Sequence, residues 1–462
     1  MLVHILYYIG HATNYVPLMS ANQDWGWYFK WDFPFFGAGL MTPGSTVLSF
    51  FIGTLVVYGI IGPCLVSTGE FVAPMGFNAA GDTTNRFFLW PGIALMTITA
   101  FTELLIHYDS LWRGIKGGVL ELYSAAMRGV HFFQRIVLRT QLTEQETDKY
   151  KQTQDENETF RPDELIPASW WIGGTFLSII FTCAIMGRYF GMPVYQSIVA
   201  ILLGFLFSFV GIQATGETDI NPVGSIGKMS QLVFAKMPAD NLQAVMKNNL
   251  MAGNISASAA SQAVDMVGDL KTGQLVGASP RSQFWAQFVA SFFAIAIAVG
   301  LFILFADAYP CIIDQNLDAE CEFGLVAVKA WASVTKLLTG ASEPLSRNSM
   351  IATIICAIAG VVFPLVRHFF VPEKYRKFYP SVSAVGIAMI NTSPEVPLAM
   401  FIGWVSGKIW KRLRRTAYDD LMYSVAAGMI AGQGISAILQ ALFKITGVKG
   451  AVITASCPMG EC

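Results

Sequence analysis

The sequence predicts an all-α protein, a polytopic transmembrane helical bundle with broken or re-entrant segments. Charged residues make up 13% of the 462 residues, whereas soluble domains carry about a quarter. The mean hydropathy is +0.50. Several apolar runs reach the roughly 20 residues that a helix needs to cross a bilayer. The formal net charge of −1 gives no basis for binding nucleic acid.

Seven long apolar runs predict spanning helices, namely residues 45–66, 87–107, 168–187, 193–212, 284–306, 350–367 and 421–443. Four further segments are shorter, more polar or interrupted, namely 1–19, 250–267, 325–339 and 381–407. The last contains Pro394 and Pro397 beside Asn391. Because proline removes backbone donors, we expect a break in that helix.

The charges in the loops predict the orientation. Basic residues flank the start of the loop 109–167 and fill the loops 367–377 and 408–415, whereas the loop 307–322 has five acidic and no basic residues. The positive-inside tendency places the first three loops in the cytoplasm and the acidic loop outside. Segment 381–407 then begins and ends on the cytoplasmic side, so it is predicted to be a hairpin or re-entrant, and 325–339 to be re-entrant or interfacial from outside. The same rule predicts that the C-terminal tail is extracellular.

This organisation divides the chain into three regions. Residues 1–108 form the N-terminal part of the bundle, residues 109–167 a cytoplasmic polar loop, and residues 168–462 the membrane transport core. The cysteines show no metal-binding spacing. In the predicted outer regions, two disulfides are conceivable, Cys311–Cys321 and Cys457–Cys462.

Residues 211–281 combine polar chemistry with flanking apolar spans. Charged side chains and unwound backbone at membrane depth are expected only where they are buried in protein or line a watery cavity. This region is therefore predicted to hold the site for a polar solute.

The motifs of this region resemble those of the oligopeptide transporter (OPT) superfamily, which includes the yellow-stripe-like transporters of metal chelates. The similar motifs begin at Gly216-Glu217-Thr218-Asp219-Ile220-Asn221-Pro222 and include Gly227-Lys228, Asn249-Leu250-Met251-Ala252, Asp269-Leu270-Lys271-Thr272-Gly273 and Gly277-Ala278-Ser279-Pro280-Arg281. The resemblance extends from about Gly37 to the end of the chain. It implies an all-helical carrier that imports small peptides or metal chelates with protons.

Two departures from the family pattern matter. Family members are longer, so the resemblance implies that early membrane helices are missing from this chain. The branch best known for peptide uptake carries an Asn-Pro-Gly motif and a basic motif with two adjacent prolines. Here Asn221-Pro222-Val223-Gly224 is only similar, and the basic motif does not occur. The substrate class therefore stays open.

Polar residues of the motif region are the candidates for substrate binding. These are Asn221, Lys228, Asn249, Asn254 and Gln283, joined by Asn391 from the broken segment. We expect Asn221, Asn249, Gln283 and Asn391 to approach one polar cavity. The alternatives are an ordinary proline-initiated helix at Asn221, a cytoplasmic loop lysine at Lys228, and packing of small residues around Asn249 and Asn254.

Acidic residues beside the apolar runs are the candidates for proton coupling, namely Glu217, Asp219 and Asp265. Desolvation would raise the pKa of such a carboxyl group toward the range where it exchanges protons. The alternative for Glu217 and Asp219 is a helix-terminal charge pair at the interface. The alternative for Asp265 is a buried structural network with Asp269 and Lys271.

These observations favour a secondary active, proton-coupled transporter of small oligopeptides. The alternative is a carrier of metal chelates, and a remote alternative is an intramembrane enzyme. No His-Glu-x-x-His and no Gly-x-Gly-Asp motif supports an enzyme, and no Walker motif supports an ATP-driven pump. The expected partners are the substrate, protons and the lipid bilayer, with no nucleic acid and no cofactor, and an oligomer is compatible with the sequence. The expected location is the plasma membrane.

Overall fold

The structure, a computed structural model, describes residues 20–21, 24–28, 32–75, 83–106, 161, 164–218, 221, 223–314, 326–340, 346–376, 378–391 and 393–447, with isolated positions from 108 to 116. Regular secondary structure in these residues is helical, and the β contacts are limited to an isolated bridge between Ala73 and Thr83. The predicted all-α fold class is confirmed.

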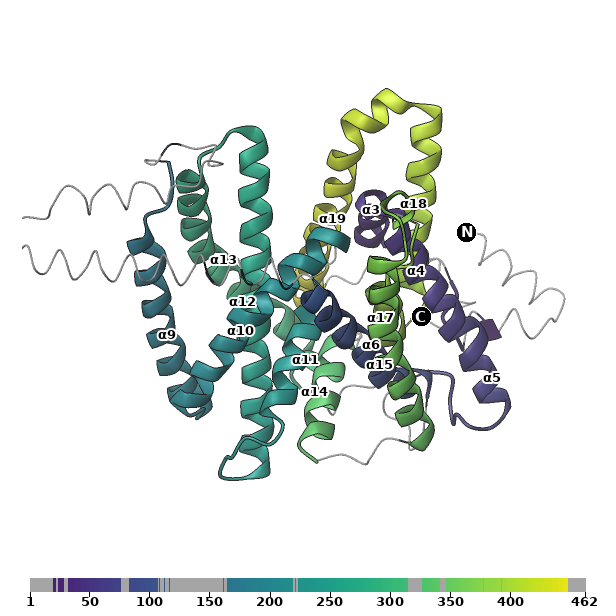
Figure 1. Cartoon of the computed structure of the whole chain (residues 1–462), viewed down its shortest axis with the longest axis horizontal. Helices are drawn as coiled ribbons and strands as arrows, with labels where there is room; N and C mark the ends of the chain where they lie inside the picture. Colours follow the sequence, from purple (N-terminus) through teal and green to yellow (C-terminus); the bar gives the residue numbers. More distant parts are fainter. Residues whose placement is uncertain are drawn as a thin grey trace, which may run out of the picture.

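The helices follow one another along the chain in Figure 1. They are α3 (Phe33–Met41), α4 (Gly44–Thr54), the π-helix η1 (Leu55–Ile61), α5 (Gly62–Ser67), α6 (Thr84–Ile106), α9 (Ala168–Phe190), α10 (Val194–Thr218), α11 (Val223–Phe234), α12 (Leu242–Val276), α13 (Pro280–Ala308), the 3-10 turn η2 (Pro310–Ile312), α14 (Val326–Leu338), α15 (Arg347–Phe369), α16 (Glu373–Arg376), α17 (Val382–Ile390), α18 (Glu395–Leu413) and α19 (Arg415–Ile445).

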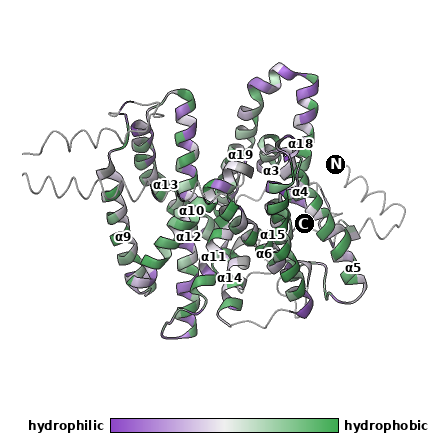
Figure 2. Cartoon of the chain, viewed as in Figure 1, coloured by the Kyte–Doolittle hydropathy of each residue, from purple (hydrophilic) through white to green (hydrophobic). Residues whose placement is uncertain are grey.

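Among the described residues, six helical segments are long and apolar enough to cross a membrane. They are Gly44–Ser67, Ser169–Phe190, Val194–Gly216, Pro280–Ala308, Arg347–Phe369 and Arg415–Ile445. They coincide with six of the seven predicted runs. The seventh run, 87–107, forms α6. Figure 2 shows apolar residues along these helices and hydrophilic residues gathered at the turn between α18 and α19.

Helices α9 to α13 form one group, in which α12 packs against both α10 and α11 (Figure 1). Small residues allow the close approach of α10 and α12: a Cβ on Gly204 would lie 3.0 Å from the Cβ of Ala259 and 3.2 Å from the Cα of Ser256. In lipid the hydrophobic effect does not drive helix association, and close packing of this kind stabilises it instead.

The second group consists of α3 to α6 and α15 to α19. Helix α6 packs on α15 and α17, and it also contacts α10 and α11 of the first group. Helix α14 contacts α11 and α12. Helix α6, which packs on Val334 of α14, therefore joins the motif-rich region to the remainder of the bundle, and α13 adds a contact with α19.

The segment 381–407 is broken as predicted, because α17 ends at Ile390 and α18 begins at Glu395. Both pieces pack against α4. The segment 325–339 forms α14, whose 13 residues are fewer than the roughly 20 required to span a bilayer. The orientation of both segments in the membrane stays a prediction. The run 250–267 lies within α12, and the run 1–19 lies outside the described residues.

Candidate functional site

A group of buried polar side chains lies where α11 and α12 meet α6, α10 and α14. We call this group the polar seam, and it consists of Ser225, Lys228, Ser230, Gln231, Asn249, Ser256 and Thr335. All of them are less than 9% exposed. Burying so many polar groups is costly unless they find partners, so their hydrogen bonds decide what the seam does.

Gln231, Asn249 and Thr335 bind one another from three helices. The Gln231 side-chain amide donates to Thr335 Oγ1 at 2.8 Å, and the Asn249 side-chain amide donates to the Gln231 carbonyl at 2.7 Å. Thr335 Oγ1 in turn donates to Asn249 Oδ1 at 3.4 Å. This network fixes α14 against α11 and α12, and Asn249 serves in it as a structural amide.

Two serines extend the seam toward α10. Ser256 Oγ lies 2.9 Å from the Ala200 carbonyl and 2.9 Å from Ser230 Oγ. Ser230 Oγ lies 3.3 Å from the Ala252 carbonyl. The predicted packing of small residues along α12 therefore coexists with a pair of hydrogen-bonded hydroxyl groups that joins α12 to α11 and α10.

Lys228 is 6% exposed and lies within α11, so it is a buried helix residue and not a loop lysine. Its helix α11 is not among the six candidate spans. Burial lowers the pKa of its ammonium group from 10.5 to about 8. No hydrogen bond or ion pair between the described residues reaches Nζ. The predicted pairing with Glu217 or Asp219 stays a prediction, because the side chain of Glu217 and all of Asp219 lie outside the described residues.

Asn221 lies before the first turn of α11. Its side-chain oxygen is buried without a hydrogen-bond partner, and it would lie 3.9 Å from a Cβ on Gly211 of α10. An unpaired buried amide oxygen costs about 1–3 kcal/mol. The Asn221 side-chain oxygen, like the Lys228 ammonium group, therefore has no hydrogen-bond partner among the described residues.

The indole of Trp331 fits against two glycines of the seam. A Cβ on Gly227 would lie 2.1 Å from Trp331 Cη2, and one on Gly253 would lie 3.0 Å from Trp331 Cζ3. Only glycine leaves room for the indole at these positions. Trp331 thereby brings α14 close enough for Thr335 to reach Gln231.

The other predicted site residues of this region lie elsewhere. Asn254 is exposed on α12 and accepts a hydrogen bond from Ser258, and Asp265 is also exposed. Gln283, at the start of α13, donates to the Ala278 carbonyl at 3.2 Å. The predicted network of Asp269 and Lys271 is divided, because Gln287 donates to Asp269 whereas Lys271 donates to Gln274.

A second polar cluster surrounds the break between α17 and α18. The Tyr58 hydroxyl of η1 is buried, donates to the carbonyl of Asn391, and accepts from the Asn85 side-chain amide at 2.9 Å. The Asn391 side chain donates to the Ser393 carbonyl at 2.6 Å. Single π-helical turns inside α-helices are frequent at functional sites.

Glu395, the first residue of α18, receives a hydrogen bond from the Tyr28 hydroxyl. Burial raises the pKa of Tyr28, and the negative charge of Glu395 raises it further, so Tyr28 remains a donor. The Oε2 atom of Glu395 is buried without a hydrogen-bond partner. Tyr28 and Glu395 thus place an incompletely paired carboxylate beside the helix break.

The four amides expected at one cavity make their contacts in different places. Asn221 and Asn249 lie in the motif region, Gln283 lies at the junction of α12 and α13, and Asn391 lies at the helix break. Sequence reasoning assigned no role to Tyr58 or Thr335. The available signal for Tyr58 was its hydroxyl group within an otherwise apolar run, and Gln231 lies in the polar region 211–281.

Comparison with known families adds the decisive observation. The profile of the OPT oligopeptide transporter protein family matches residues 4–444. The chain belongs to the OPT family. This confirms the resemblance seen in the motifs between Gly216 and Arg281, and it identifies a family of transporters, not of enzymes.

The chain is similar to three relatives in this family. A Saccharomyces cerevisiae protein, named as a candidate oligopeptide transporter, is 26% identical over 94% of this chain and 62% of its own length. A metal-nicotianamine transporter of Arabidopsis thaliana is 23% identical over 92% of this chain and 61% of its own length. The iron-phytosiderophore transporter yellow stripe 1 of Zea mays is 23% identical over 95% and 62%.

The chain therefore spans about three-fifths of the length of these relatives. Membership of the OPT family together with the six apolar helices identifies an integral, multi-pass membrane protein.

Proposed function

We propose that this OPT chain forms the substrate-handling part of a secondary active, proton-coupled transporter of small oligopeptides in the plasma membrane. The observation that carries the proposal is the buried Lys228 ammonium group, for which the described residues supply no partner. A peptide brings a C-terminal carboxylate, which is the opposite charge that a buried lysine requires. Family membership supports transport as the activity.

The unpaired Asn221 side-chain oxygen supports the same site. The N–H groups and the terminal ammonium group of a peptide are suited to donate hydrogen bonds to this oxygen. Asn221 precedes α11, and Lys228 lies in the second turn of that helix. We propose that Lys228 binds the carboxylate of a zwitterionic substrate and that Asn221 binds its ammonium group.

Metal chelates are the second candidate substrate. Two relatives are named for metal-nicotianamine and iron-phytosiderophore transport. Chelators of this class carry carboxylates and amines, so the same lysine and amide suit them. The chemistry of Lys228 and Asn221 therefore supports a carboxylate-bearing substrate in both cases.

For proton coupling we propose the acids that adjoin these groups. Glu217 and Asp219 precede Asn221 in sequence and are the candidates nearest to Lys228 along the chain. Asp265 is the third candidate, although its side chain is exposed on α12. Glu395 is a further candidate, because the structure gives it a buried, incompletely paired oxygen beside a helix break.

An uptake panel tests the proposal. Reconstituted protein is given labelled tetrapeptides and pentapeptides in one series and iron chelates in another, at acid and at neutral outside pH. We expect accumulation of peptides that increases at acid outside pH. Accumulation of chelates alone would transfer the proposal to the second candidate, and accumulation of neither would contradict it.

A further inference from the structure

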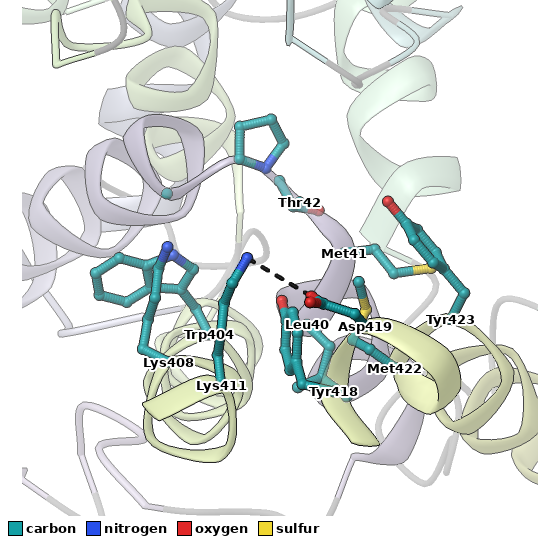
Figure 3. A pocket seen from close by; sticks show the side chains of 12 residues that line it. Leu40, Met41, Thr42, Trp404, Lys408, Lys411, Tyr418, Asp419, Met422 and Tyr423 are labelled. Carbon is teal, nitrogen blue, oxygen red and sulfur yellow. Dashed lines mark ion pairs between the residues drawn. The ribbon is translucent and has the colours of Figure 1, made fainter. Parts of the chain in front are cut away.

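A cavity of about 320 Å³ lies between the turn that joins α3 to α4, the end of α18 and the start of α19. Figure 3 shows its walls, which include Thr42, Trp404, Lys408, Lys411, Tyr418 and Asp419. It shares no lining residue with the polar seam or with the cluster at the helix break. The proposed transport path leaves this cavity without a role.

The cavity is rich in donors and cations. Lys408 Nζ lies 5.6 Å from the centre of the Trp404 ring, and Lys411 Nζ lies 5.1 Å from the centre of the Tyr418 ring. Asp419 supplies the one carboxylate among the lining residues. It is engaged with Lys411 at 3.9 Å, marked by the dashed line in Figure 3, and with Arg415 at 3.8 Å. None of the ion pairs between described residues includes Lys408.

The indole nitrogen of Trp404 adds a neutral donor to the cavity, from the same helix as Lys408 and Lys411. It lies 2.7 Å from the place that a Cβ on Gly44 would occupy, so glycine at this position lets the indole pack against the start of α4. The backbone at the start of α4 adjoins the same wall, and no side chain caps it. Two ammonium groups and an indole N–H, opposed by one carboxylate, suit a ligand with several anionic oxygens.

The location of the cavity limits what that ligand is. The candidate spans Gly44–Ser67 and Arg415–Ile445 both begin beside it, so the cavity lies at a membrane boundary. From Lys408 to Asp420 the chain carries five basic and two acidic residues, a surplus of three positive charges. Basic pockets between membrane helices on the cytoplasmic side suit anionic headgroups. Aromatic side chains such as Trp404, Tyr418 and Tyr423 are typical of the same layer.

We propose that this cavity binds the phosphate of an anionic phospholipid headgroup. Lys408 and Lys411 hold the phosphate oxygens, the Trp404 indole donates a further hydrogen bond, and the acyl chains leave toward the lipid. Such a lipid connects the turn between α18 and α19 to the start of α4. The proposal is independent of the transported substrate.

Native mass spectrometry of the purified protein with phosphatidylglycerol and phosphatidylcholine tests the assignment. We expect retention of phosphatidylglycerol over phosphatidylcholine, and we expect the double variant Lys408→Gln/Lys411→Gln to lower that retention about tenfold or more. The matched control is Arg412→Gln/Arg414→Gln, which removes the same charge from the same segment outside the cavity lining. We expect the control to retain phosphatidylglycerol.

Equal losses in the two double variants would overturn the proposal in favour of a diffuse basic surface. Complete displacement of the lipid by millimolar inorganic phosphate would show that the ligand is a soluble phosphate compound. Gly44→Ala provides a second variant in case the lysine pair fails to fold, because it reshapes the cavity beside Trp404 without changing charge. Unchanged lipid retention in Gly44→Ala would also contradict the proposal.

Discussion

The Tyr58 hydroxyl donates a hydrogen bond to the carbonyl of Asn391, although the two residues are 333 positions apart in the chain. Tyr58 lies in the π-helix η1, and Asn391 is the residue directly after the end of α17. One side chain therefore holds a widened helix turn against the break in another helix. The Asn85 amide, which donates to the same hydroxyl, connects both to α6.

Tyr58→Phe should destabilise the protein by about 1–3 kcal/mol, because the Asn391 carbonyl and the Asn85 amide lose a buried partner. Thermal unfolding of the protein in detergent measures the change. Tyr189→Phe is the matched control, since Tyr189 is 78% exposed on α9. A Tyr58→Phe variant as stable as this control would show that the hydrogen bond does not support the break.

Gly227→Ala should also destabilise the protein, by about 1–3 kcal/mol, because the new Cβ overlaps the Trp331 indole. The displaced indole would move α14 and lengthen the contact between Thr335 and Gln231. Gly174→Ala is the control, because a Cβ at Gly174 of α9 meets no atom within 4 Å. Unfolding temperatures that fall equally in both variants would argue against the fit of Trp331 on α11.

Lys228→Met should raise the unfolding temperature and lower the uptake of peptides that have a free C-terminal carboxylate. At neutral pH the folded protein bears the cost of burying the charge, at most about 3 kcal/mol for a pKa lowered from 10.5 to about 8. Between pH 8 and pH 10.5 the unfolded chain binds a proton that the folded chain has released. Wild-type stability therefore increases with pH in that window, and the advantage of the variant should shrink there.

The control for this prediction is Lys236→Met, which removes an exposed lysine just after α11. Its unfolding temperature should match that of the wild type at every pH. If Lys228→Met is instead less stable than the wild type at pH 7, a carboxylate outside the described residues pairs with Lys228, and Glu217 and Asp219 become the first candidates.

The acidic loop 307–322 should face the outside or a lumen. Cys311 is disulfide-bonded, as expected for an oxidising compartment, whereas Cys321 lies outside the described residues. A cysteine introduced by Asp318→Cys, together with Cys311→Ser and Cys321→Ser, should react with an impermeant thiol reagent on intact cells. Labelling only after permeabilisation would reverse the predicted orientation.

Apolar length predicted the helices well, because a bilayer-spanning helix needs a long uncharged run wherever it lies in the fold. The run 193–212 became α10, and the prolines after Asn391 separated α17 from α18. Both outcomes depend on local composition and backbone chemistry alone. The segment 325–339, which the loop charges predicted to be re-entrant or interfacial, forms the 13-residue helix α14, and its orientation in the membrane stays a prediction.

The site was less accessible to sequence reasoning, since it depends on which helix face is buried. Asn249 and Asn254 looked equivalent, yet they lie about 140° apart around α12 at 100° per residue. One became a buried network member and the other an exposed residue. The partnership of Tyr58 with Asn391 crosses most of the chain, and no local pattern encodes it.

The most direct test of the central claim compares a labelled peptide that has a free C-terminal carboxylate with its C-terminal amide. Uptake is measured at acid outside pH in wild type, Lys228→Met and Lys236→Met. We predict that wild type and Lys236→Met favour the free carboxylate by about tenfold or more, and that Lys228→Met loses this preference. A preference that persists unchanged in Lys228→Met would contradict the assignment of Lys228 as the carboxylate-binding residue.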